Sequence, residues 1–172
     1  MGNNLYYYVA ESIYISKLRY GAQLLGKVCW NNDDVKTGDL NALQVTYYKL
    51  ARLINNTRIS DKIESKVIFG KLGWLSFNQM NAQIKLLEAW KMVNVVDYPI
   101  KFEQKSAELN GRLTRAASKG EVHEPGSSKI GMSTFISDAA RAWNKSLPSL
   151  KNTNSIYSAK KQIKKIALTV PF

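Results

Sequence analysis

The chain has 172 residues, of which 25 are Lys or Arg and 13 are Asp or Glu, so its formal net charge is +12. A chain of this length buries roughly 68–70% of its unfolded surface, which is enough for one hydrophobic core or two small ones. A hydrophobic content of 45% argues against general disorder. The positive charge makes nucleic acid or another anionic surface the first partner to consider, with a merely solvated set of lysines as the plain alternative.

Cysteine and histidine usage excludes several kinds of site. The single cysteine, Cys29, cannot form an internal disulfide or a multi-cysteine zinc site, and the single histidine, His123, cannot build a multi-histidine metal site. Both counts fit a reducing intracellular compartment, nuclear or cytoplasmic. Because no apolar run reaches about 18 residues, we expect no transmembrane helix and no membrane partner. We also expect no cofactor.

The first half of the chain reads as a succession of helices. Residues 4–30 predict a long helix that is apolar or tyrosine over most of its circumference, so it needs more than one covering neighbour. Either this helix is the centre of the bundle, or part of its covering is missing. A polar loop follows, and residues 39–55 predict a second helix that starts at an aspartate cap. Asp61 and Glu64 have the spacing of a capping box, which predicts a short third helix ending at Gly70.

A second capping box, Ser76 with Gln79, predicts a helix that runs to about Val93. Trp74, in the short connector before this helix, is expected to close the end of the bundle as a core residue. Five apolar residues recur at helical spacing and predict the core face of this helix: Phe77, Met80, Ile84, Leu87 and Trp90.

The pattern weakens after residue 94. Residues 101–110 predict a short helix, and residues 111–132, which are rich in glycine, predict a loop that can include one short β-hairpin. A helix then starts near Phe135 with apolar residues at i, i+3, i+4 and i+7 and stops before Pro148. Three of its residues are expected in the core: Phe135, Trp143 and Leu147. A last helix over residues 155–169 carries apolar residues on one side and lysines on the other.

Catalytic motifs are weak throughout. Asp33-Asp34 lies in a polar stretch without flanking apolar strands, so a loop followed by a helix cap is the better interpretation than a metal-binding pair. His123-Glu124 lacks the second histidine of a zinc protease helix, and no phosphate-binding glycine loop occurs. We therefore predict no catalytic residue and no metal ligand in this chain.

Four motifs, taken in order, resemble one family. They are Tyr20-Gly21, Gly73-Trp74-Leu75-Ser76, Ser133-Thr134-Phe135 and Trp143-Asn144-Lys145-Ser146-Leu147-Pro148. Together, from about Leu5 to the end, they are similar to the C-terminal region of reverse transcriptases from non-long-terminal-repeat retrotransposons. The resemblance implies the thumb and the segment after it, with the catalytic palm absent. In that family the thumb holds the template–primer duplex of RNA or DNA against the palm and fingers of the same polyprotein.

Binding residues are predicted from clustered positive charge. The last 40 residues hold seven positive side chains against one negative, Asp138. Phosphate neutralisation by such a cluster gives salt-dependent affinity without sequence preference, although a solvated face is an equally open interpretation. The predicted nucleic-acid-binding residues are Arg112, Arg115, Lys119, Arg141, Lys145, Lys160, Lys161, Lys164 and Lys165. The first three lie in the glycine-rich segment, where an ordinary basic loop is the alternative.

The predicted fold is all-α: a helical bundle, a loop-rich link and two packed C-terminal helices. The expected division is a thumb-like bundle over residues 1–94, a basic link over 95–132 and a helical pair over 133–172. The expected function is non-catalytic gripping of nucleic acid as part of an RNA-directed DNA polymerase. A stand-alone basic helical module that binds other proteins is the alternative.

Overall fold

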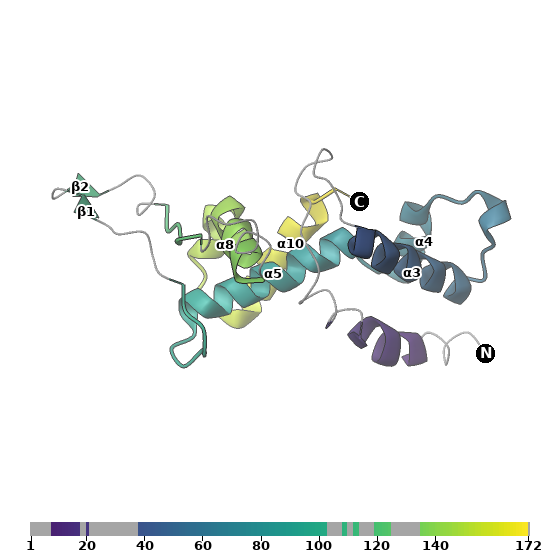
Figure 1. Cartoon of the computed structure of the whole chain (residues 1–172), viewed down its shortest axis with the longest axis horizontal. Coiled ribbons are helices and arrows are strands. Elements are labelled where there is room, and N and C mark those ends of the chain that lie inside the picture. Colours follow the sequence, from purple (N-terminus) through teal and green to yellow (C-terminus); the bar gives the residue numbers. More distant parts are fainter. Residues whose placement is uncertain are drawn as a thin grey trace. The chain divides into compact units, whose positions relative to one another are not determined.

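The computed structural model describes residues 8–17, 20, 38–102, 108–109, 112–113, 119–124 and 135–171, with the backbone alone at 10–11, 38–41, 108–109 and 112–113. The described part is mostly helical, with one short hairpin, which confirms the predicted all-α fold class (Figure 1). The chain divides into two compact units, Met1–Asn81 with Val170–Phe172 and Ala82–Thr169. This division falls inside helix α5 (Phe77–Asn94), whereas the sequence pattern places a boundary at the end of that helix.

In the first unit, residues 8–17 are helical and include the π-helical segment η1 (Ala10–Ile15). Ile15 is buried, but the exposed apolar side chains of this segment are Tyr8, Val9, Ile13 and Tyr14. The described side chains of this helix are therefore only partly covered, which agrees with the second of the two interpretations of the sequence pattern. Apart from residue 20, the remainder of the predicted helix over 4–30 lies outside the described residues.

Helix α3 (Gly38–Ile54) confirms the second predicted helix to within one residue at each end. Helix α4 (Ser65–Leu72) continues through Gly70, where the sequence pattern predicts its end. Gly73 ends it instead, because this residue adopts a φ of +67°, a left-handed conformation that favours glycine at a helix C-terminus.

The start of α4 also differs from the prediction. Asp61 Oδ2 accepts the backbone N–H of Arg58 at 2.7 Å, so its carboxylate closes the short 3₁₀ turn η2 (Ile59–Asp61). Glu64 is then the residue immediately before α4 and provides no side-chain cap. The predicted capping residue Asp61 thus closes the turn η2 and does not cap the start of α4.

An aromatic cluster forms the core of this unit. The Tyr47 ring lies 5.1 Å from the Phe69 ring, stacks on Trp74 at 5.6 Å, and lies 6.2 Å from Phe77, measured between ring centroids. Tyr47 Oη donates a hydrogen bond to the Leu75 carbonyl at 3.0 Å. Trp74 is half-buried and belongs to this cluster.

Helix α5 begins as predicted. The Gln79 N–H donates to Ser76 Oγ at 3.2 Å, and the Ser76 N–H donates to Gln79 Oε1 at 3.0 Å, which completes the capping box. Burial extends over most of its circumference rather than one face. The predicted core residues Phe77, Met80 and Trp90 are buried, whereas Ile84 and Leu87 are half-buried. The helix also buries residues outside the predicted face: Asn78, Gln79, Asn81, Ala82, Lys85, Leu86, Ala89 and Met92.

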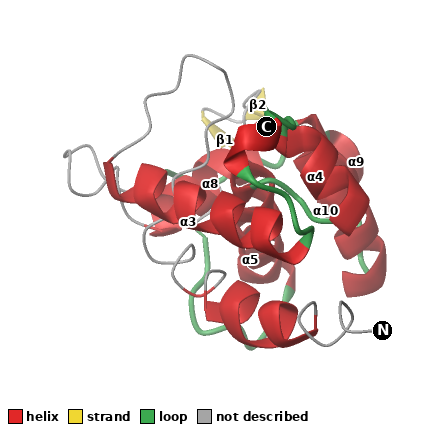
Figure 2. Ribbon diagram, turned by 90° about the vertical axis from the view of Figure 1, so that its right-hand side faces the viewer, coloured by secondary structure: helices red, strands yellow, loops and turns green. Residues whose placement is uncertain are grey.

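The second unit adds three helices to the rest of α5: α8 (Phe135–Lys145), α9 (Pro148–Lys151) and α10 (Ile156–Thr169), which follow one another across short turns (Figure 2). The Trp90 indole N–H joins α5 to the turn after α9, donating to Thr153 Oγ1 at 2.9 Å. Helices α8 and α10 lie where the sequence predicts two C-terminal helices, and the short α9 between them was not predicted.

One short hairpin is described. Strand β1 (Glu108–Leu109) pairs antiparallel with β2 (Arg112–Leu113), with Leu109 opposite Arg112. The helix predicted over residues 101–110 is therefore wrong at 108–109. The missed signal is the Asn110-Gly111 dipeptide between the strands, because Asn-Gly strongly favours a two-residue hairpin turn.

Candidate nucleic-acid interface

The last helix has a buried face and a basic face. Its buried residues are Ala159, Ile163, Ile166 and Ala167. Four exposed lysines, here called the lysine ridge, cover other sides of the helix: Lys160, Lys161, Lys164 and Lys165. Helical spacing explains this separation, since residues three and four apart share a face. The ridge is thus carried by a helix whose opposite side is anchored in a core.

Two adjacent side chains of helix α8 hold residues 119–124 in place, and these residues are here called the pinned segment. Trp143 is 1% exposed, and its indole N–H donates to the Gly120 carbonyl at 2.9 Å. Asn144 pairs with both backbone groups of Val122: its Oδ1 accepts the N–H at 2.9 Å and its Nδ2 donates to the carbonyl at 3.0 Å. The expected burial of Trp143 is confirmed, and its polar atom also has a structural role.

The end of the same motif corrects one core assignment. Ser146 Oγ donates to the Trp143 carbonyl at 2.6 Å, and Leu147 then adopts an extended conformation immediately before Pro148 starts α9. Leu147 is 57% exposed, so its predicted place in the core is wrong. Helical periodicity does not extend past α8, and Leu150 provides the buried side chain of α9 instead.

Phe135, the third predicted core residue of this region, is half-buried at the start of α8. The Lys85 ammonium lies 4.1 Å from its ring centroid, which is the geometry of a cation–π contact. Lys85 is itself 1% exposed, and its Nζ lies 3.8 Å from Asp138 Oδ2. Burial lowers the pKa of Lys85 to about 8, and the Asp138 charge opposes this shift. Helical periodicity alone does not predict that a lysine of α5 is buried against α8.

Arg141 is held by carboxylates of its own unit. Its Nη1 lies 3.1 Å from Asp138 Oδ1, and its Nε lies 3.7 Å from Glu124 Oε2. Together with Lys85, these groups link α5, α8 and the segment 119–124. Arg141 is therefore ion-paired, which distinguishes it from the exposed lysines in the predicted nucleic-acid-binding set.

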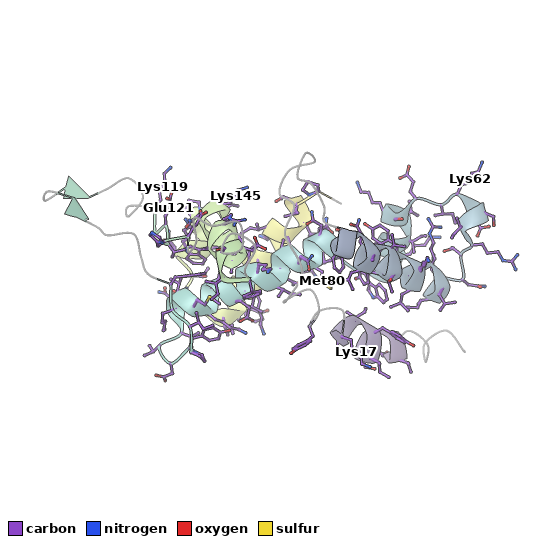
Figure 3. All side chains as sticks on the ribbon, in the orientation of Figure 1. Lys17, Lys62, Met80, Lys119, Glu121 and Lys145 are labelled. Atoms are coloured by element: carbon purple, nitrogen blue, oxygen red, sulfur yellow. The ribbon has the colours of Figure 1, made fainter. Side chains whose placement is uncertain are left out.

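A cleft of about 700 Å³ opens beside the pinned segment. It is lined by Val93, Asn94, Lys119, Gly120, Glu121, Trp143, Asn144, Ser146, Pro148, Lys151 and Asn152. Lys151 Nζ donates to the Lys119 carbonyl at 3.0 Å and lies 5.9 Å from the Trp143 ring. Burial lowers the pKa of the Lys151 ammonium. Figure 3 shows Lys119 and Glu121 on this segment beside α8.

The other predicted binding residues lie in different surroundings. Lys119 is exposed on the pinned segment, and Lys145 is exposed at the end of α8 (Figure 3). Arg112 lies in β2, where the backbone alone is described, and Arg115 lies outside the described residues. The structure therefore groups Lys119, Lys145 and the lysine ridge in one compact unit.

Within the described ranges, no group of three or more His, Cys, Asp and Glu side chains is placed to hold a metal ion. Asp33-Asp34 and Cys29 lie outside those ranges. None of the described helices is both long enough and apolar enough to cross a membrane. The chain matches no known protein family, no curated protein and no solved structure.

Proposed function

We propose that this chain grips the sugar–phosphate backbone of nucleic acid and is not an enzyme on its own. The observation that carries the proposal is the lysine ridge, which presents four exposed cations on a helix anchored by its opposite face. Each phosphate that a lysine neutralises releases condensed counterions, which favours binding without sequence preference. Lys119 and Lys145 supply further exposed cations in the same unit.

The resemblance gives this proposal a more specific form. We propose that the chain is the thumb and post-thumb portion of a non-long-terminal-repeat retrotransposon reverse transcriptase, acting inside the cell in the nucleus or cytoplasm. Its ligand would be a template–primer duplex of RNA or DNA, and its partners the palm and fingers of the same polyprotein. Support comes from Trp143 and Asn144, two motif residues that each have a defined structural task here.

The test removes charge from the ridge without disturbing the helix. We expect the triple variant Lys161→Gln, Lys164→Gln, Lys165→Gln to keep its stability within about 0.5 kcal/mol, because all three side chains are exposed. If these lysines contact phosphates, the slope of log affinity against log salt for duplex binding drops by up to about three units. Fluorescence anisotropy over a salt series measures that slope.

A matched triple in the other unit controls for net charge. Lys49, Lys66 and Lys71 are exposed lysines of α3 and α4, and replacing them by Gln removes the same charge far from the ridge in sequence. The proposal requires the ridge triple to lower the slope more than this control. Equal effects would attribute binding to overall charge, and unchanged binding in both would contradict a gripping role for the ridge.

A protein-interaction module is the second candidate, and exposed apolar residues of the first unit favour it. Leu53 and Ile59 are each about three-quarters exposed, and Val45 and Val67 are also exposed. Single exposed apolar residues are ordinary on protein surfaces, so this observation is weaker than the lysine ridge. Absence of duplex binding at low salt would favour this second function over the first.

A further inference from the structure

Next to the lysine ridge, α10 carries an aromatic residue that the electrostatic argument does not use. Tyr157, in the first turn of α10, is 79% exposed. Lys160, Lys161 and Lys164 follow it at i+3, i+4 and i+7, so the four side chains occupy neighbouring positions on the helix surface. Tyr157 lies away from the buried face, which the smaller or aliphatic residues of α10 supply. The core of this unit therefore does not explain the tyrosine.

Aromatic rings and cations perform different tasks in nucleic-acid binding. A basic surface attracts the phosphates of any duplex or single strand. An exposed aromatic ring gains energy only from a base whose face is accessible, because bases within a duplex already stack on one another. A surface that combines both is suited to a strand with unpaired bases.

We propose that Tyr157 and the lysines Lys160, Lys161 and Lys164 form a binding face for single-stranded nucleic acid. The Tyr157 ring stacks on one unpaired base, and the lysines contact phosphates on either side of that base. This inference rests on the proposed function and narrows it, since it names the part of the nucleic acid that α10 holds. A template overhang or the end of a primer is the kind of segment that offers such a base.

The helix geometry supports one continuous contact rather than four separate ones. A rise of about 1.5 Å per residue places Lys160 about 4.5 Å and Lys164 about 10 Å along the axis from Tyr157. The face is therefore long enough for a few nucleotides. Leu168, 55% exposed four residues after Lys164, continues the same side toward the end of the helix.

Substitutions at Tyr157 separate stacking from charge. In the full chain, Tyr157→Leu keeps an apolar side chain but removes the ring, whereas Tyr157→Phe keeps the ring and removes the hydroxyl. We expect Tyr157→Leu to weaken binding of a short single-stranded oligothymidylate roughly 5- to 150-fold, the usual effect of losing one base-stacking contact. Tyr157→Phe is expected to bind within about twofold of the wild type, because the phenyl ring presents the same stacking face.

Three comparisons complete the experiment. Tyr157→Leu is expected to leave the salt slope, the affinity for blunt duplex and the affinity for heparin unchanged, because none of these depends on an exposed base. Tyr14→Leu, at a 56% exposed tyrosine of the first unit, is expected to leave single-strand binding unchanged. Circular dichroism of each variant checks that α10 is still folded.

Several results would overturn the inference. Wild-type affinity of Tyr157→Leu for the single strand would refute stacking, and so would an equal loss in Tyr157→Phe, which would assign the effect to the hydroxyl. An equal loss for heparin would replace base recognition by simple polyanion binding. If the wild type binds duplex with a steep salt slope while Tyr157→Leu changes nothing, this inference fails and the proposed function stands. If the wild type binds neither duplex nor single strand, both fail.

Discussion

At the scale of single residues, Trp143 connects the buried interior of α8 to the segment that carries Lys119. Its ring is almost fully buried, and its N–H satisfies the Gly120 carbonyl. Gly120 has a φ of +60°, a conformation that favours glycine. The Trp143 hydrogen bond and the left-handed conformation of Gly120 therefore stabilise the same segment.

We expect Trp143→Ala to lower the free energy of unfolding by roughly 3–5 kcal/mol, because it removes a large buried side chain and leaves a cavity. Trp143→Phe keeps part of the ring volume but leaves the Gly120 carbonyl without its donor, and we expect a smaller loss of about 1–3 kcal/mol. Urea denaturation of the full chain measures both values. A loss below about 1 kcal/mol for Trp143→Ala would contradict the burial of this residue.

Lys85 predicts a pH dependence of stability. Its pKa in the folded chain is about 8 against an ordinary 10.5, so below pH 8 both states bind the proton and the folded state bears the full cost of burying the charge. As the pH rises from 8, the folded state loses the proton first, and stability increases. We expect a gain of roughly 2 kcal/mol between pH 8 and pH 10. Chemical denaturation across this pH range measures it.

The variant Lys85→Met is expected to lack this gain, while Asp138 keeps Arg141 as its partner. Lys71→Met, at an exposed lysine, is the control and keeps the gain. The upper limit of pH 10 matters because the hydrogen bond to Glu88 raises the pKa of Tyr98 to about 12, which makes stability fall above pH 10. A wild-type curve that is flat from pH 8 to pH 10 would refute the assignment to Lys85.

At the scale of elements, local sequence signals predicted where helices lie better than they predicted which residues make tertiary contacts. The reciprocal bonds of Ser76 and Gln79 involve residues three apart, so their spacing in the sequence suffices to place the start of α5. The position of Asp61 led to a wrong helix start, because a carboxylate can close more than one nearby turn and local spacing does not decide which. The burial of Lys85 depends on residues from α8, which no local pattern contains.

Ser76 offers an element-scale prediction. Ser76→Ala removes the oxygen that accepts the Gln79 N–H, and we expect it to lower the free energy of unfolding by about 1 kcal/mol. Ser149→Ala, at an exposed serine within α9, is the matched control and should change stability by less than about 0.5 kcal/mol. Thermal and urea denaturation measure both variants. Equal small effects would mean that the capping box contributes little to α5.

The candidate site was predictable only in part. The alternation of lysines with apolar residues on α10 shows one basic and one apolar face, so the exposure of Lys160, Lys161, Lys164 and Lys165 follows from the sequence. Arg141 pairs with Asp138 at helical spacing, but its second ion pair is with Glu124, 17 residues earlier in the chain, and could not be read from that spacing. The exposure of Leu147 follows from the chain turning between two helices, where a helical pattern no longer applies.

At the scale of the whole molecule, an excess of 12 positive charges creates a field that reaches beyond any single contact. Such a field accelerates encounters with polyanions and weakens as salt screens it, with a Debye length of about 8 Å at physiological ionic strength. Half of the net charge comes from the last 40 residues. Long-range attraction is therefore expected to bring nucleic acid to the unit that carries the lysine ridge.

This charge distribution predicts how association responds to salt. We expect the association rate constant for duplex to fall at least tenfold between low and physiological salt, with a smaller change in the dissociation rate, because steering acts mainly on the encounter. Duplexes of equal length but different sequence should bind with affinities within about threefold of one another, since phosphate contacts carry no sequence information. Stopped-flow fluorescence with two unrelated duplexes measures both quantities. A rate constant that is insensitive to salt, or a strong preference for one sequence, would show that contacts other than the basic surface dominate recognition.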